Sequence, residues 1–353
     1  MKKMTRIFGI TIITAVGLTA CGQTNTDHKN HESTKEKKTE QKEMKMNQEV
    51  TAPKEMNQGA SNDLLTTSLK NVTRLNTNDP SQMAVLTSQT IWPATHKENQ
   101  PGAVILVPAS EWQLGIASAD LIHHPNNGPI LFIEKEKIPE MTLKEIKRLN
   151  PIGTKDGTQI MVMGDVGTSA LEQLKGYKVK QIKETDPAIF AKDVDKEYAD
   201  ITGSYPNSVI IGSSAEEGRL YTTPAVNWIS HMPEPLLYTE KNKVPEATIE
   251  ALKMRKDKAN IYVLGPEKIV SKEVEKELSK YGKVTRISGE TPTENSIAFA
   301  KFKDEKTKFG WGFTKPGHGF LLGSTSDISF ETQGILDERL EIVQESSQGH
   351  GGH

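Results

Sequence analysis

Cysteine is nearly absent from this sequence: Cys21 is the only one in 353 residues, so no disulfide can form within the chain. A basic excess is absent too, because 44 basic residues face 46 acidic ones, and this balance gives no indication of nucleic-acid binding. The sequence contains neither a Gly-x-Ser-x-Gly nucleophile elbow nor a Gly-x-x-x-x-Gly-Lys-Ser/Thr phosphate loop. These absences exclude a disulfide framework and two common catalytic sites.

The remaining candidates for chemistry are weak. Gly317, Gly319 and Gly323 loosely resemble a dinucleotide-binding fingerprint, but they precede an apolar strand instead of following one. Asp193 and Asp195 lack the spaced ligands and the closing glutamate of a calcium loop. We therefore expect no catalytic residues, no metal and no cofactor.

Residues 1–20 have the pattern of a secretory signal peptide. Three basic residues precede an apolar run over residues 7–18, which is too short to span a bilayer comfortably. The run ends in Leu-Thr-Ala-Cys, which resembles a bacterial lipobox and implies that Cys21 is diacylated and anchors the protein to the membrane. The alternative is an ordinary signal peptide with an incidental cysteine.

Residues 21–62 are rich in Lys, Glu, Gln, Asn, Thr and His and contain very few large apolar residues. Such a segment cannot bury enough apolar surface to offset the chain entropy that folding costs. We expect a disordered tether whose mean reach is about 35 Å. The mixture of Lys and Glu argues against a dedicated lipid-binding helix, which is the alternative for this segment.

A short signature recurs along the chain at nearly constant spacing. It reads VTRISG from residue 284, VTRLN from residue 72 and, in a weaker form, VKQI from residue 179. The copies start 107 and 105 residues apart, which is too long for a solenoid repeat and about right for one small α/β unit. The sequence therefore predicts units at residues 63–176 and 177–282, a partial third unit at 283–327 and a diverged polar tail at 328–353.

From about residue 64 onward, short apolar runs alternate with helical segments. The expected strands cover residues 103–107, 128–133 and 159–163 in the first unit, and 208–212, 235–238 and 260–265 in the second. Each run is continuously apolar, which is typical of strands in a parallel sheet that is covered on both faces. We predict the α/β class, with tandem small open parallel-sheet repeats of flavodoxin- or Rossmann-like type packed into a pseudo-symmetric module whose third repeat is incomplete.

Four features recur in the same order within the units. They are the VTRISG-like opening, an apolar strand that runs into a small polar turn, a Pro-Ile-Leu or Pro-Leu-Leu strand after the second helix, and a glycine that closes the third strand. This order, over residues 71–326, resembles the cell wall-binding repeat 2 family of Gram-positive bacteria. The resemblance implies that each unit is a small open-sheet α/β domain and that three units pack into a module that binds anionic wall polymers.

Ligands of open parallel sheets bind beyond the carboxyl ends of the strands, so the turns after the first strand of each unit form the candidate site. Small hydroxyl residues there can present backbone amides to an anion, or they simply cap the helices. The two signature arginines suit either an acidic group of a polymer or an acidic residue of a neighbouring unit. Nearby carboxylates, such as that of Glu216, would repel a polyanion unless a cation intervened. The candidate polymer-binding residues are Arg74, Ser110, Ser213, Ser214, Arg286, Ser324 and Thr325.

These features together predict a non-catalytic lipoprotein at the extracytoplasmic face of the membrane, in the cell wall space. It would bind an anionic wall polymer, or a glycopolymer attached to peptidoglycan, and would hold the membrane close to the wall. One alternative is an extracytoplasmic solute-binding lipoprotein, which needs two lobes and a hinge where this chain has repeats. A second alternative, an envelope enzyme, is supported only by the acidic residues at the strand ends.

Overall fold

The computed structural model describes residues 66–68, 73–75 and 77–314 of the chain. These residues all belong to one unit of the structure, which spans residues 53–353. Several predicted features lie outside the described residues and stay predictions: the signal peptide, the lipidated Cys21, the tether, Ser324, Thr325 and the polar tail.

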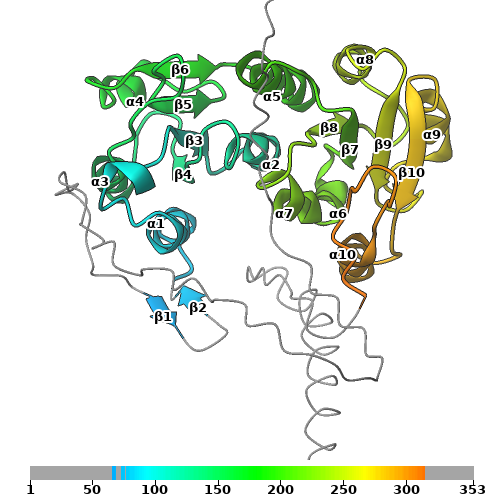
Figure 1. The fold of residues 1–353 in the computed structure, drawn as a ribbon, viewed down its shortest axis with the longest axis horizontal. Helices are drawn as coiled ribbons and strands as arrows, with labels where there is room; N and C mark the ends of the chain where they lie inside the picture. The colour runs from blue at the N-terminus through cyan, green and yellow to red at the C-terminus, as the bar shows by residue number, and fades with distance from the viewer. Residues whose placement is uncertain (1–65, 69–72, 76, 315–353) are drawn as a thin grey trace, which may run out of the picture. The chain divides into compact units, whose positions relative to one another are not determined.

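Two parallel sheets of four strands each form the framework (Figure 1). In the first sheet the strand order is β4-β3-β5-β6, and in the second sheet it is β8-β7-β9-β10, so the two sheets share one topology. The predicted α/β class with parallel sheets is therefore confirmed. The strands are β3 (Val104–Pro108), β4 (Ile130–Ile133), β5 (Ile160–Met163), β6 (Val179–Ile182), β7 (Ser208–Ser213), β8 (Leu236–Thr239), β9 (Ala259–Leu264) and β10 (Gly282–Ile287).

The signature copies end up in different places from those that the sequence predicts. Strands β6 and β10, which carry the second and third copies, pair in parallel with β5 and β9 and so complete the two sheets. The first copy forms β2 (Thr73–Leu75), which pairs antiparallel with β1 (Thr66–Ser68). Each four-stranded sheet thus ends one strand later than the expected boundaries after residues 176 and 282. The reason is that strand pairing is a long-range choice, whereas the repeat was delimited by where its signature begins.

Three helices begin with the same local chemistry. In α1 (Pro80–Ile91), α5 (Pro187–Thr202) and α10 (Pro292–Lys301), a proline occupies the first helical position, where its missing N–H costs nothing. The preceding residue is Asp79, Asp186 or Thr291, and its side chain accepts a hydrogen bond from a backbone N–H of the first turn. The remaining helices are α2 (Trp112–Ser118), α3 (Glu140–Leu149), α4 (Thr168–Glu172), α6 (Arg219–Thr222), α7 (Val226–Ile229), α8 (Glu246–Lys253) and α9 (Lys272–Leu278), with short 3-10 turns η1 (Lys97–Asn99), η2 (Ala119–Leu121), η3 (Glu216–Gly218) and η4 (Thr223–Ala225).

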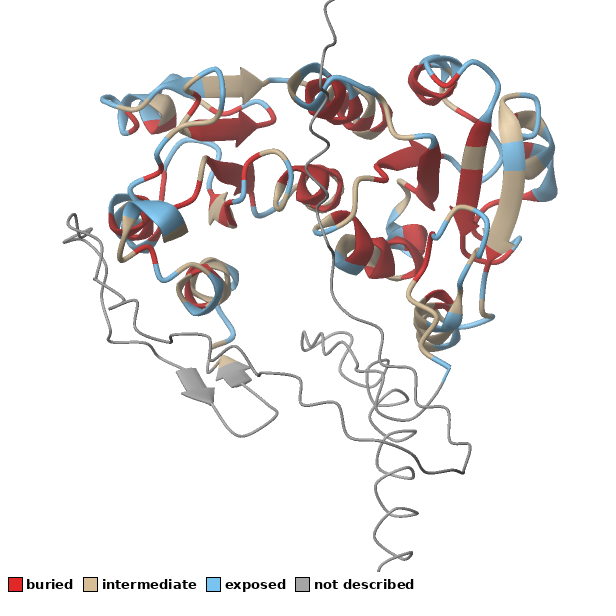
Figure 2. Ribbon diagram, viewed as in Figure 1, coloured by how far each residue is buried: buried red, intermediate tan, exposed pale blue. Residues whose placement is uncertain are grey.

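The central strands are buried along nearly their whole length (Figure 2). Along β3, successive side chains point to opposite faces of the sheet, so Val104 and Leu106 pack with α1 and α3 residues, while Ile105 and Val107 join a larger core that continues into the second sheet. Burial on both faces explains why the strand sequences are continuously apolar. The larger core therefore makes the two sheets parts of one packed structure.

Arginines at corresponding positions tie a helix pair together beside each sheet. Arg255 makes two hydrogen bonds to Asp195 on α5, at 2.7 and 2.8 Å, and donates to the carbonyl of Pro206 at 2.9 Å. Arg148, which lies 107 residues earlier, pairs with Glu145 at 2.7 Å and donates to the carbonyls that follow α1. The arginine keeps its place, but its acidic partner comes from a different helix.

Candidate functional site

The turn after β7 contains two of the serines predicted to contact an anion. Ser213 is 1% exposed, and its hydroxyl accepts a hydrogen bond from the backbone N–H of Ala215 at 3.3 Å. Ser214 donates from its hydroxyl to the carbonyl of Thr239 at 3.4 Å, and its own carbonyl accepts from the Gln113 side chain at 3.1 Å. Both serines therefore serve contacts within the protein, and a polymer would reach Ser213 only after this turn moved.

The other strand-end positions are less uniform. Ser110 is exposed in the turn after β3, and its hydroxyl donates to the Glu111 carboxylate at 3.4 Å. Arg74 lies on β2, which belongs to the two-stranded sheet and to neither four-stranded sheet. Among the described residues, Ser110, Ser213 and Ser214 thus lie at the ends of the equivalent strands β3 and β7, whereas Arg74 and Arg286 lie on other strands.

Arg286, on β10 of the second sheet, forms an ion pair and a hydrogen bond within the protein. Its guanidinium donates to the Glu275 carboxylate on α9 at 3.0 and 2.7 Å, and to the carbonyl of Gly265 at 2.7 Å. In the first sheet the corresponding residue is Gln181, which donates to the carbonyl of Gly164 at 2.9 Å. Arg286 thus has the acidic partner that was the second of its two expected roles, and this partner lies on α9, the helix that directly precedes β10.

Both of these glycines end a central strand with a positive φ, 83° at Gly164 and 107° at Gly265. This left-handed conformation is costly for residues with a side chain and turns the backbone sharply away from the strand. The side chains of Gln181 and Arg286 stabilise that turn by donating hydrogen bonds to the glycine carbonyls. The glycine that sequence analysis recognised as closing the third strand therefore has a backbone reason.

A contact that sequence analysis missed lies where α2 meets the turn after β7. The indole N–H of Trp112 donates to the Glu216 carboxylate at 2.8 Å, and the Trp112 ring meets Tyr238 edge-on with ring centroids 6.3 Å apart. The Tyr238 hydroxyl donates to the carbonyl of Gln113 at 2.7 Å, and burial raises its pKa well above the usual value. Arg219 lies over the Trp112 ring at 5.9 Å and pairs with Glu216 at 3.3 Å.

This junction changes how the strand-end carboxylates are interpreted. Because Glu216 accepts from Trp112 and pairs with Arg219, its charge is balanced by groups of the protein. The turn that was predicted to hold an anion is also the place where the beginning of α2 docks. The available signal was a tryptophan at the first position of a helix, since a large amphipathic ring there needs both an apolar surface and a polar partner.

Asp120 is a buried carboxyl group on η2, which packs against α5 and α7. It is 2% exposed, and neither of its oxygens has a hydrogen-bond partner within the described residues. Burial raises its pKa well above the usual range, Asp195 and Glu234 raise it further, and Arg255 opposes the shift. Burial, with Asp120 nearby, raises the pKa of Tyr198 to about 12. We assign Asp120 to packing, because η2 lies against α5 and α7 at this place.

The rings of three histidines lie close together. The ring centroids of His123 and His124 are 4.1 Å apart, and those of His123 and His231 are 4.6 Å apart. Across the described ranges, no three His, Cys, Asp or Glu side chains are placed to hold a metal ion. Among the helices described, none combines the length and the apolar character needed to cross a bilayer.

No family model matches the chain. The Amidase enhancer of Bacillus subtilis (strain 168) is 25% identical over 187 residues, which are 51% of this chain and 24% of that protein. The chain therefore spans about a quarter of the length of this relative.

Two solved structures resemble the fold of this chain. Cwp6 from Clostridium difficile superimposes with a TM-score of 0.54 at 22% identity, over 62% of this chain and 34% of that one. Cwp8 from Clostridium difficile superimposes with a TM-score of 0.51 at 20% identity, over 65% of this chain and 37% of that one. At these identities the likeness establishes the α/β fold and leaves the function to be inferred.

Proposed function

We propose that this protein is a non-catalytic lipoprotein of the cell envelope, a member of the cell wall-binding repeat 2 family, which binds anionic wall polymers through tandem repeats. The observation that carries the proposal is the likeness of its fold to Cwp6 and Cwp8, which are cell wall proteins. The partial similarity to an amidase enhancer points to the same compartment. Cys21 would carry the lipid anchor, and residues 21–62 would let the folded part reach from the membrane into the wall.

The shared strand order and the matching arginines support the tandem-repeat part of the proposal. Helix packing supports it too: α5 packs against α2, and α10 packs against α6 in the same succession. On this reading α10 is the first helix of the third repeat. Its side-chain N-cap and its proline match the starts of α1 and α5.

One face of α1 is exposed where the matching face of α5 is buried. Tyr198 on α5 is 7% exposed in the packing of α5 against α2 and η2, whereas its counterpart 107 residues earlier, Ile91 on α1, is 57% exposed. Val194, which is 1% exposed, likewise corresponds to Thr87, which is only half-buried. In a module with cyclic pseudo-symmetry, the third repeat would cover this α1 face, because a head-to-tail contact either closes or continues.

Co-sedimentation with purified sacculi tests the proposed function. The full chain is expected to sediment with intact sacculi and to stay in solution after acid has stripped the covalently attached wall polymers. Among the residues predicted to contact the polymer, Ser110 is exposed, so Ser110→Asp is expected to weaken sedimentation by charge repulsion. Absence of sedimentation with intact sacculi would overturn the proposal and favour a receptor for a small ligand.

A further inference from the structure

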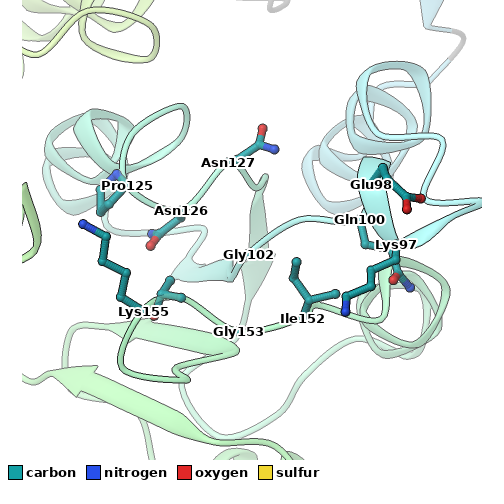
Figure 3. Close-up of a pocket in the computed structure, with 11 residues that line it drawn as sticks. Lys97, Glu98, Gln100, Gly102, Pro125, Asn126, Asn127, Ile152, Gly153 and Lys155 are labelled. Atoms are coloured by element: carbon teal, nitrogen blue, oxygen red, sulfur yellow. The ribbon is translucent and has the colours of Figure 1, made fainter. Parts of the chain in front are cut away.

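A pocket of about 600 Å³ lies at the amino-terminal end of the first sheet, opposite the strand-end turns discussed above (Figure 3). Its walls are formed by the segments that precede β3, β4 and β5, which are all parallel and therefore begin at the same edge. Lys97, Glu98 and Gln100 come from one segment, Asn126 from the second, and Ile152 and Lys155 from the third.

Backbone hydrogen bonds hold these three segments at fixed distances. Gly102 donates to the carbonyl of Asn126 at 2.9 Å, and Gly153 donates to the carbonyl of Gly102 at 2.8 Å. A Cβ at Gly102 would lie 2.6 Å from the Asn126 carbonyl oxygen, so only glycine allows this approach. The floor of the pocket is therefore preformed.

The pocket is a property of the first sheet. Eleven residues separate Arg148 from Ile160, but only five separate the corresponding Arg255 from Ile261, so the first sheet carries six additional residues here. The additional loop contributes Ile152 and Lys155 to the pocket.

The additional loop is internally braced. Asp156 accepts from the Thr154 hydroxyl at 2.6 Å and from the backbone N–H of Thr158 at 3.0 Å, and these bonds hold its pKa well below the usual value. Its carboxylate is therefore satisfied by the loop. A loop that is longer than its counterpart and held in one conformation is a typical carrier of function.

Gln100 supplies a polar group that the protein leaves unused. Its side chain lines the pocket, and no hydrogen bond joins its carboxamide to a described residue. Asn126 lines the same pocket and is fully buried, and its side-chain oxygen has no hydrogen-bond partner within the described residues. A buried polar group without a partner costs about 1–3 kcal/mol, so such groups are normally paired. Gln100 and Asn126 thus supply polar groups that can bond with a molecule that enters the pocket.

The charges around the pocket are mixed. Lys97 and Lys155 are exposed, and neither forms an ion pair with a described residue, while Glu98 adds one carboxylate. Figure 3 shows Lys97 and Ile152 on one side and Lys155 with Asn126 on the other. Ile152 is 51% exposed and adds an apolar side chain to the pocket wall.

We infer that this pocket binds an anionic saccharide of one or two rings. Hydroxyl groups of a sugar donate to Glu98 and pair with the Gln100 amide, an acidic substituent faces the two lysines, and the C–H face of a ring covers Ile152. A simple inorganic anion would meet the lysines but would be repelled by Glu98 and would leave Ile152 bare. The volume suits a ligand of this size. This inference deepens the proposed function, on which it rests for the wall as the source of the saccharide.

NMR titration of the full chain tests the pocket directly. The probes are digalacturonate, glucose 6-phosphate, neutral lactose and inorganic phosphate, so that a carboxylate sugar is distinguished from a phosphate sugar. At least one acidic sugar is expected to bind about tenfold more tightly than lactose and phosphate, because an ion-paired hydrogen bond adds to the hydroxyl contacts. Equal binding of lactose, or no binding of either acidic sugar at millimolar concentration, would overturn the inference.

Matched variants locate the binding. Lys97→Met with Lys155→Met, and separately Gln100→Ala, are expected to weaken the acidic sugar about tenfold. Lys276→Met is the control, because Lys276 is an exposed lysine on α9 without an ion pair among the described residues. Unchanged binding in the pocket variants would overturn the assignment, and their far-ultraviolet circular dichroism would verify that they fold.

The two proposals fail separately. Sedimentation of the wild-type chain with sacculi, without binding of any acidic sugar, would overturn the pocket and leave the wall-binding function. Sugar binding that is lost in the lysine double variant, without sedimentation of the wild-type chain, would overturn wall binding and leave the pocket as a saccharide site.

Discussion

The indole nitrogen of Trp112 lies 2.8 Å from a carboxylate oxygen of Glu216, and this hydrogen bond joins the first helix after β3 to the turn after β7. Residues 104 positions apart in sequence thereby share the turn that was predicted to receive a ligand. The contact shows how one repeat-like half uses the strand ends of the next as a docking place.

Removing this hydrogen bond is expected to have a small but specific effect. Trp112→Phe keeps most of the ring and loses the N–H, so the free energy of unfolding should fall by about 0.5–1 kcal/mol, because the contact is partly exposed. Glu216→Gln should lower the free energy of unfolding by a similar amount. The neighbouring exposed Glu217→Gln is the control, and urea denaturation is the measurement. An equal loss in the Glu217 variant would contradict the assignment.

The buried pair of Arg255 and Asp195 is expected to be far more costly to break. Both side chains are at most 1% exposed, so Arg255→Met leaves a buried carboxylate unpaired and should cost about 3–5 kcal/mol of unfolding free energy. Replacing both residues by Leu and Met should recover part of this loss. As a matched exposed pair on α5, Lys196 and Asp200 provide the control, and Lys196→Met should cost less than about 1 kcal/mol.

Asp120 predicts a dependence of stability on pH. Its pKa is raised in the folded state, so the folded protein holds this proton over a pH range where the unfolded chain, with a pKa of about 3.9, has released it. By linkage, its contribution to stability is complete below about pH 4 and is lost as the pH rises through the folded pKa.

Asp120→Asn should therefore stabilise the protein at pH 7 and leave it nearly unchanged at pH 4, as measured by urea midpoints. Burial also raises the pKa values of Asp195 and Glu234. Their contributions to the pH dependence are present in both proteins, so they cancel when the variant is compared with wild type. A stability difference that does not vary with pH would show that Asp120 is not protonated in the fold.

Ile91 tests whether the exposed face of α1 is covered in the complete chain. If another repeat or another copy packs there, Ile91→Asp should lower the unfolding free energy by about 1–3 kcal/mol, because a charge would be buried without a partner. Met141→Asp on α3, at a comparable 39% exposed position, should change it by less than about 0.5 kcal/mol. Equal effects would mean that nothing covers α1.

Arg286 separates a structural role from a polymer contact. Arg286→Gln places at β10 the residue that β6 carries at Gln181, so the bond to Gly265 is retained while the ion pair with Glu275 is lost. We expect a loss of about 1 kcal/mol or less in unfolding free energy and unchanged sedimentation with sacculi. Loss of sedimentation at full stability would return Arg286 to the polymer site.

The α/β class and the approximate positions of six apolar strands followed from the sequence by itself. Continuous apolar runs indicate burial on both faces of a sheet. These properties depend on neighbours within a few residues, so they can be predicted from the sequence without knowledge of any tertiary contact.

Tertiary structure alone decided which sheet receives each signature strand, that Ser213 is buried, that Trp112 reaches Glu216, and that loops before three strands form one pocket. Each of these joins residues that are distant in sequence. The same apolar strand pairs equally well with either neighbour by composition, and only the packing of the whole sheet selects one. Local pattern therefore determined the elements, and long-range pairing determined which side chains meet.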